Sequence, residues 1–136
     1  MSILATIESL PHILISEADE QRLMAIATAA SQRVPEVSAV LVSELERADI
    51  WPETAMPADV VRIGSIIEFE FDDGRRLKLQ LVLPKYADIN AGRISVLTPV
   101  GAALIGLSPR QSMEWSGNDG KERVLTVLTV SHPQSD

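Results

Sequence analysis

Two stretches within the first 50 positions carry apolar side chains every three to four residues, which is the period of an amphipathic helix. The first stretch follows Ser16 and the second follows Pro35. The apolar positions are Leu23, Ile26, Ala27 and Ala30 in the first stretch, and Val37, Leu41, Leu45 and Ala48 in the second, with Val40 beside them. Glu44, Glu46, Arg47 and Asp49 are expected on the solvent side. The pattern predicts two short helices.

The residues at the ends of these stretches indicate where the helices begin and end. Ser16 can accept a hydrogen bond from a first-turn N–H, and Asp19 partly imitates the acid of a capping box. Pro35 limits the far end of the first helix. Because only a few residues around 33–36 separate the helices, we expect a short antiparallel hairpin or coiled coil. Each arm would have about 15 residues and a length of roughly 22 Å.

Two proline dipeptides, Trp51-Pro52 and Met56-Pro57, then interrupt the helical pattern. Proline lacks a backbone N–H and cannot comfortably continue a helix. We therefore predict a linker at residues 51–59, between an N-terminal unit at residues 1–50 and a C-terminal unit at residues 60–136.

Alternating apolar and charged residues at 67–71 and 77–81 predict a β-hairpin. A three-residue loop at 72–74, with Gly74 in the left-handed conformation, also predicts its register. The expected pairs are Phe71 with Arg75, Glu70 with Arg76, Phe69 with Leu77, Glu68 with Lys78 and Ile67 with Leu79. This register places apolar opposite apolar and acid opposite base, whereas a shift by one residue loses those pairs.

The last third of the chain predicts another strand at 93–97, a short helix and a second hairpin. Thr98-Pro99, followed by Gly106, is typical of a short capped helix. The second hairpin is expected from 113–115 and 124–130. Strict alternation in its last strand places Leu125 and Val127 on one face, and Val124, Leu128 and Val130 on the other. The chain is thus predicted to be an α+β protein, with a helical hairpin followed by a small, mostly antiparallel sheet that carries one short helix.

Composition narrows the range of functions. The 136 residues are 46% hydrophobic and 23% charged, which is typical of globular chains, and the formal net charge is −7. That charge opposes binding to a phosphate backbone, so we expect no direct contact with free nucleic acid. The first 15 residues lack the basic segment of a secretory signal and the long apolar run of a membrane span. We therefore expect a cytoplasmic protein without membrane contact.

The sequence contains no recognisable catalytic arrangement. Cysteine is absent, and His12 and His132 lack the spacing of metal ligands. The segment 101–106 lacks the lysine of a phosphate-binding loop, and Asp72 and Asp73 are typical turn residues. No nucleophile elbow is present. We expect no catalytic residue, no metal and no cofactor, and hence no enzyme activity.

Two charged residues, Arg33 and Glu36, fall at the predicted tip of the helical hairpin. An acid at such a tip is presented to a partner. Alternatively, Glu36 only favours the positive start of the second helix, and Arg33 is a solvated charge. The residues alone leave both interpretations open.

Residues 94–106, together with 87–93 before them, resemble the C-terminal domain of the Gre transcription elongation factors. The resemblance extends over roughly residues 58–131. It is closest to a short subgroup named regulator of nucleoside diphosphate kinase. The motifs that carry it are Met56-Pro57-Ala58-Asp59-Val60-Val61, Leu83-Pro84 and Thr98-Pro99-Val100-Gly101-Ala102-Ala103-Leu104.

This resemblance implies an FKBP-like C-terminal domain that docks on bacterial RNA polymerase near the entrance of its secondary channel, with the helical hairpin directed inward. The docking loop of the family corresponds to Leu97, Thr98, Pro99 and Val100, although Thr98 and Pro99 also fit a purely capping role. Family members that stimulate transcript cleavage hold metal through acids at the tip of a much longer coiled coil. Here Glu36 is the only acid within residues 33–37. The expected function is that of a monomeric regulator that competes with Gre factors without stimulating cleavage.

Two other functions remain open. The implied fold suggests a peptidyl-prolyl isomerase-like peptide-binding domain, but fold alone does not transfer activity. With Phe69 and Phe71 committed to the hairpin, an aromatic proline pocket is hard to assemble. The name of the subgroup suggests direct regulation of nucleoside diphosphate kinase. An effect on the kinase through transcription is the simpler hypothesis.

The chain departs from the family at 109–112, where a Gly-Asp turn is usual.

Overall fold

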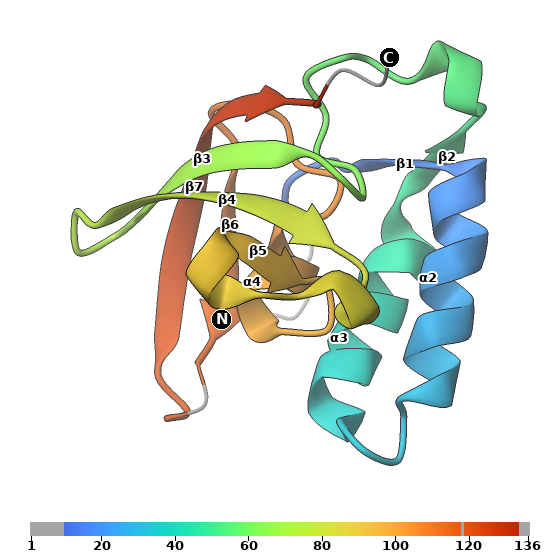
Figure 1. Cartoon of the computed structure of the whole chain (residues 1–136), viewed down its shortest axis with the longest axis horizontal. Helices are drawn as coiled ribbons and strands as arrows, with labels where there is room; N and C mark the ends of the chain where they lie inside the picture. Colours follow the sequence, from blue (N-terminus) through green and yellow to red (C-terminus); the bar gives the residue numbers. More distant parts are fainter. Residues whose placement is uncertain (1–9, 118, 134–136) are drawn as a thin grey trace.

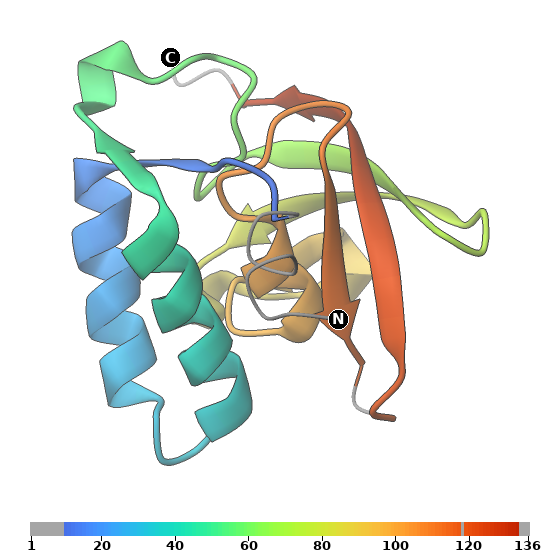
Figure 2. The ribbon, with the colours of Figure 1, turned by 180° about the vertical axis from the view of Figure 1, so that it is seen from behind.

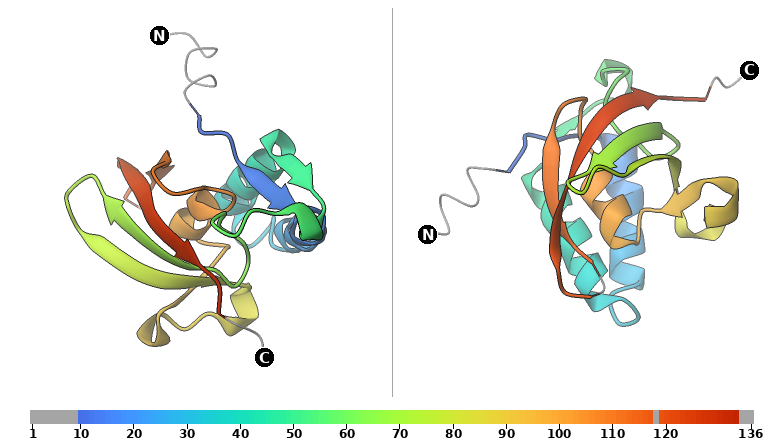
Figure 3. Two further views of the ribbon diagram at one scale, coloured as in Figure 1. Left: turned by 90° about the horizontal axis from the view of Figure 1, so that it is seen from above. Right: turned by 90° about the vertical axis from the view of Figure 1, so that its left-hand side faces the viewer.

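A pair of α-helices lies beside a curled five-stranded sheet, and a short third helix sits between them (Figures 1 and 3). The computed structural model describes residues 10–117 and 119–133. The elements are β1 (Leu14–Ser16), α2 (Glu17–Ala29), α3 (Pro35–Arg47), β2 (Asp49–Trp51), β3 (Ile66–Phe71), β4 (Arg76–Val82), β5 (Arg93–Ser95), α4 (Pro99–Leu104), β6 (Ser112–Ser116) and β7 (Glu122–Ser131), with 3₁₀ turns η1 (Glu53–Ala55), η2 (Pro84–Tyr86) and η3 (Ile89–Ala91). The sheet order is β5-β4-β3-β7-β6, in which β5 runs parallel to β4 and the other neighbours are antiparallel. The predicted α+β class is confirmed.

The helices α2 and α3 run side by side in opposite directions and meet at a turn (Figure 2). They bury Leu23 and Ala27 from the first predicted stripe and Leu41 and Leu45 from the second. Ser16 Oγ accepts a hydrogen bond from the backbone N–H of Asp19 at 3.1 Å, as predicted for the N-cap. Each arm has 13 residues and is therefore about 20 Å long. The coiled-coil and FKBP-like descriptions remain predictions.

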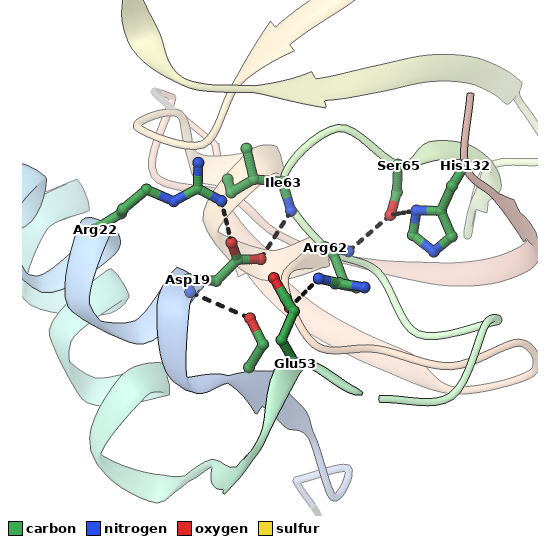
Figure 4. A network of polar contacts seen from close by, with 8 residues as sticks. Asp19, Arg22, Glu53, Arg62, Ile63, Ser65 and His132 are labelled. Carbon is green, nitrogen blue, oxygen red and sulfur yellow. Dashed lines mark hydrogen bonds and ion pairs between the residues drawn. The ribbon is translucent and has the colours of Figure 1, made fainter. Parts of the chain in front are cut away.

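The carboxylate of Asp19 joins α2 to the loop that leads into the sheet (Figure 4). It is 2% exposed, forms an ion pair with Arg22 and accepts a hydrogen bond from the backbone N–H of Ile63 at 3.2 Å. The local capping interpretation therefore missed the contact with Ile63, which lies 44 positions away. A buried carboxylate needs such partners because an unpaired charge in the interior is costly.

The predicted solvent side of α3 contains a buried acid. Glu44 is 5% exposed, and its Oε2 accepts a hydrogen bond from Arg47 Nη2 at 2.6 Å. Arg47 also donates to the backbone carbonyl of Pro11. The prediction that Glu44 faces solvent is therefore wrong, because Arg47 on the next turn supplies the partner that allows a carboxylate to be buried.

The predicted linker is partly paired. Its first residue, Trp51, ends strand β2, which runs parallel to β1 with Ile50 opposite Ile15. Further along, Glu53 of η1 forms an ion pair with Arg62 (Figure 4). The segment thus holds the two halves together instead of merely connecting them. The division at residues 51–59 into two units remains a prediction.

One hydrophobic core extends from the helices to the sheet. Ile13 and Ile15 belong to the same buried cluster as Leu41, Phe69 and Leu125.

No helix within residues 10–117 and 119–133 is long and apolar enough to span a membrane.

The register of the β3–β4 hairpin is confirmed. Phe69 lies opposite Leu77, Glu68 opposite Lys78 and Ile67 opposite Leu79. The Phe71 N–H donates to the Arg75 carbonyl, the Phe71 carbonyl accepts from the Gly74 N–H, and Gly74 has φ +91°. The cross-strand pairing and the turn therefore agree on a single register.

Strand β7 contains a β-bulge that the alternation did not reveal. Phe69 lies opposite Val127, but Glu68 lies opposite Thr129, so Leu128 is the extra residue. Val130 consequently lies opposite Ile67 and packs against the core. The prediction that it shares a face with Val124 is wrong, because a bulge shifts the period-two alternation by one residue.

The turn at 109–112 contains a non-glycine residue in the left-handed conformation. Arg110 has φ +75°, a conformation that favours glycine. Its backbone N–H donates to the Val127 carbonyl at 2.8 Å, and Gln111 accepts from Val127 at 3.0 Å. These two hydrogen bonds hold the left-handed residue in place.

Replacing Asp19 by alanine is expected to lower the free energy of unfolding by about 1–3 kcal/mol, because it leaves a backbone donor and Arg22 without their shared partner. Urea unfolding followed by circular dichroism measures this change. Glu17→Ala is the matched control, since Glu17 is an exposed acid in the same helical turn. Equal losses in the two variants would show that the interaction with the helix dipole, and not the contact to Ile63, accounts for the effect.

Candidate functional site

The loop that enters α4 is held in place by hydrogen bonds around Thr98. The Thr98 hydroxyl donates to the Ser95 carbonyl at 2.7 Å and accepts from the Gly101 N–H at 3.0 Å. Pro99 occupies the first turn of the helix, where a missing N–H has no cost. A Cβ on Gly101 would collide with the carbonyl oxygen of Ser95, so only glycine fits there. These contacts show the predicted capping role of Thr98 and Pro99.

The four predicted docking residues are all half-buried, but they do not share one environment. Leu97 and Val100 pack against the hydrophobic core. Pro99 instead lines a surface groove of about 650 Å³ between α3, α4 and β6, hereafter the α3–α4 groove. Pro99 is therefore the member of this loop best placed to contact a partner.

The α3–α4 groove brings together residues from both predicted site groups. Glu36 of the helix tip lines it together with Pro99. Val40, which is 45% exposed, and Trp115 add apolar surface. Arg33 is exposed in the turn between the helices and is not among the residues that line the groove. The structure thus joins Glu36 to the loop before α4 and leaves Arg33 apart.

Carboxylates surround the apolar surface of the groove. Glu36 and Glu114 are exposed and line it, whereas Glu44 is buried in its ion pair with Arg47. An acidic rim around apolar side chains favours a partner that carries basic residues beside an apolar contact.

The turn between β6 and β7 closes one end of the groove, which Gly117 and Gly120 line. Arg123 Nη2 forms an ion pair with Asp119 Oδ2 at 2.9 Å, and its guanidinium lies 5.6 Å from the ring centroid of Trp115. Hydrogen bonds from the Arg123 side chain and from the Lys121 backbone lower the pKa of Asp119 to about 2. Asp119 is therefore ionised throughout the neutral range, so both partners of the ion pair carry their charges.

The sequence does not show that Val40 and Trp115 line one groove. The sequence does show that Val40 lies beside the apolar stripe of its helix and not within it, which is a weak sign of exposure. For Trp115 it predicts only a strand, and the distance of that strand from α3 depends on how the sheet packs. No local sequence pattern therefore predicts that these two residues lie on the same groove.

The two histidines lie apart. His12 Nε2 is 2.7 Å from Asp49 Oδ2, and His132 Nδ1 is 3.0 Å from the buried hydroxyl of Ser65 (Figure 4). Within residues 10–117 and 119–133, no three His, Cys, Asp or Glu residues are grouped so that they could hold a metal ion.

Comparisons with known proteins cover both halves of the chain. A family described as "Transcription elongation factor, GreA/GreB, C-term" matches residues 56–132, and one described as "Rnk N-terminus" matches residues 11–50. A regulator of nucleoside diphosphate kinase from Escherichia coli (strain K12) is 33% identical over 126 residues, which cover 91% of this chain and 92% of that protein. The chain belongs to the GreA/GreB family.

Two further GreA/GreB relatives show how this chain compares with the family in length and in fold. GreA from Rhizobium leguminosarum bv. trifolii is 34% identical over 95 residues, 66% of this chain but only 60% of that protein. A solved GreA/GreB structure from Nitrosomonas europaea covers 88% of this chain and 99% of its own, with 31% identity and a TM-score of 0.70. The resemblance to Gre factors and to their short subgroup is confirmed. The named relatives are transcription factors or regulators.

Replacing Gly101 by alanine is expected to destabilise the protein by about 1–3 kcal/mol, since the new Cβ meets backbone atoms that cannot move independently. Thermal unfolding measures the change. Gly117→Ala is the matched control, because its Cβ meets only side-chain atoms of Arg123 and Asp119, which can rotate away. A Gly101→Ala protein as stable as the control would contradict the close approach of Ser95.

Proposed function

We propose that this protein binds bacterial RNA polymerase near the entrance of the secondary channel and competes there with Gre elongation factors. The observation that carries the proposal is the GreA/GreB match over residues 56–132, which includes the whole loop before α4 and strand β6 beside the groove. The full-length similarity to the regulator of nucleoside diphosphate kinase extends the likeness to the helices.

In this proposal the α3–α4 groove and its loop form the docking surface. Pro99 makes direct contact, and Thr98 holds it in position through its two hydrogen bonds. Leu97 and Val100 anchor the loop to the core. The apolar side chains of the groove are buried on docking, and the exposed Glu114 favours a basic partner surface. Glu36 belongs to the helix tip and is assigned to the channel.

The helix tip, with Arg33 and Glu36, is proposed to enter the channel without reaching the active centre. The 13-residue arms are about 20 Å long, and the GreA relative extends well beyond the segment that it shares with this chain. Longer family members are expected to deliver metal through several acids at the tip, whereas this tip offers Glu36 alone. The protein therefore occupies the site without stimulating transcript cleavage.

The net charge of −7 fits this role. An acidic chain is repelled by the phosphates of nucleic acid, so it acts on a transcription complex through the protein component. We propose that it does so as a monomer and without a cofactor.

The name of the full-length relatives favours a second function, an influence on nucleoside diphosphate kinase. We infer that this influence arises through transcription of the kinase and not through contact with it. The purified kinase should then transfer phosphate at the same rate with and without this protein, whereas a changed rate would indicate direct regulation.

Pro99→Glu is expected to weaken binding of the full-length protein to immobilised core RNA polymerase at least tenfold. It places an unpaired charge in a contact that becomes desolvated on docking, and a loss of about 1.4 kcal/mol already corresponds to tenfold. Surface plasmon resonance, with GreA as competitor, measures both affinity and shared occupancy. An acid is tolerated at the start of a helix, so the fold should persist.

Pro52→Glu is the matched control, since it makes the same change at an exposed proline of the paired linker. Glu36→Ala should leave docking nearly unchanged and alter only effects inside the channel. The proposal is contradicted if wild-type protein does not bind at micromolar concentration, if GreA does not displace it, or if Pro52→Glu weakens binding as much as Pro99→Glu.

A further inference from the structure

A second depression, which shares no lining residue with the α3–α4 groove, lies where α2 meets the β4–β5 connection. Its volume is about 580 Å³, within the range of small-molecule sites of roughly 300–1,000 Å³. Arg22 of α2 forms one wall, and the η2 segment, which projects from the sheet (Figure 3), forms another. We call this depression the basic pocket.

The charge of the basic pocket differs in sign from that of the chain. Three cations line it, Arg22, Lys85 and Arg93, but only one carboxylate, Asp88. The whole chain carries 19 acids against 12 Lys and Arg residues, so a quarter of its cations gather at this one place. Since the three come from α2, η2 and β5, the fold and not local sequence brings them together. Such a cluster attracts an anion.

Arg22 is oriented by an anchored partner. One of its Nη atoms pairs with Asp19, which is 2% exposed and fixed by the Ile63 N–H (Figure 4). The Arg22 side chain itself is 49% exposed. A guanidinium has five N–H donors, so the pair with Asp19 leaves others for a ligand. The buried carboxylate thus holds a donor group at the mouth of the pocket.

Arg93 and Lys85 form the facing wall. Arg93 Nε donates to the carbonyl of Tyr86 at 3.1 Å, and its Nη2 lies 3.7 Å from Asp88 Oδ2. Lys85 Nζ lies 5.1 Å from the ring centroid of Tyr86. Within the described part of the chain, no carboxylate lies within ion-pair distance of Lys85, so its charge is available to a ligand.

Tyr86 adds a ring to this group of cations. It is 56% exposed, an unusual state for an aromatic side chain, and it lines the pocket beside Lys85 and Arg93. An exposed ring can stack on a planar base, and stacking of this kind contributes substantially to nucleotide binding. Clustered cations suit phosphate groups, because hydrogen bonds between charged donors and phosphate oxygens are strong.

We propose that the basic pocket binds a nucleoside di- or triphosphate, with the phosphates held by Arg22, Lys85 and Arg93 and the base stacked on Tyr86. A chain of two or more phosphates offers acceptor oxygens to cations from all three elements. The ligand then contacts both α2 and the sheet, so its binding affects the angle between the helix pair and the docking loop. This proposal does not depend on contact with RNA polymerase.

Isothermal titration calorimetry of the full-length protein tests the proposal. The probes are GDP, ADP, guanosine, pyrophosphate and a short single-stranded RNA, each at low and at moderate salt. We expect GDP or ADP to bind with a dissociation constant below about 1 mM, and to bind more tightly than guanosine or pyrophosphate, because only a nucleotide uses both the cations and the ring. Binding should weaken as salt rises.

Two variants separate the roles of charge and ring. Lys85→Gln and Tyr86→Leu should each weaken nucleotide binding roughly tenfold, and both residues are exposed, so folding should be unaffected. Tyr86→Leu should leave the weak binding of pyrophosphate unchanged, since the ring does not contact phosphate. Lys121→Gln, which removes an exposed lysine in the β6–β7 turn, is the matched control and should bind as the wild type does.

The proposal is overturned if neither nucleotide binds at millimolar concentration. It is also overturned if pyrophosphate binds as tightly as GDP and ADP, which would indicate a simple anion site, or if the RNA binds more tightly than the nucleotides. A loss in Lys121→Gln equal to that in Lys85→Gln would show a general charge effect and would contradict the assignment to this pocket.

Discussion

The carboxylate of Asp19 is buried where the helix pair meets the sheet, and it is satisfied from both sides. Arg22 neutralises it from within α2, and Ile63 donates a backbone hydrogen bond from the loop before β3. A buried charge tolerates no loss of such partners, so the two halves cannot separate without exposing it. Together with Ile13 and Ile15 in the shared core, this contact fixes the helix tip relative to the loop before α4.

Features encoded by neighbouring residues could be predicted from the sequence, and features encoded by distant ones could not. The pairing of Phe69 with Leu77 follows from a turn and two alternating strands, and the cap at Thr98 follows from Thr98-Pro99 and the glycine after the helix. The bulge at Leu128 has no local signature, because β3 and the packing beneath it decide where an extra residue fits. The ion pair that buries Glu44 involves the distant residue Pro11, whose carbonyl accepts a hydrogen bond from Arg47. The capped entry to α4 was predicted correctly, but only the packing of α3 against α4 and β6 forms a groove beside it.

The molecule presents two surfaces of opposite charge near the junction between the helices and the sheet, namely the α3–α4 groove and the basic pocket. The α3–α4 groove combines exposed apolar side chains with acids, as suits a basic protein surface. The basic pocket combines three cations with an exposed ring, as suits a small anion with a planar group. Asp19 contributes to both, since it holds the angle of the helices and also orients Arg22. The first surface carries the proposed docking function, whereas the second follows from the arrangement of charges in this chain.

We propose that this short Gre-like protein occupies the polymerase site of its longer relatives without their chemistry. The decisive measurement is transcript cleavage by backtracked RNA polymerase, with and without GreA. This protein alone should leave cleavage at its intrinsic rate, and increasing amounts should suppress the stimulation by GreA towards that rate. Stimulation of cleavage by the protein alone, or full GreA activity in its saturating presence, would show that the proposed competition without cleavage is wrong.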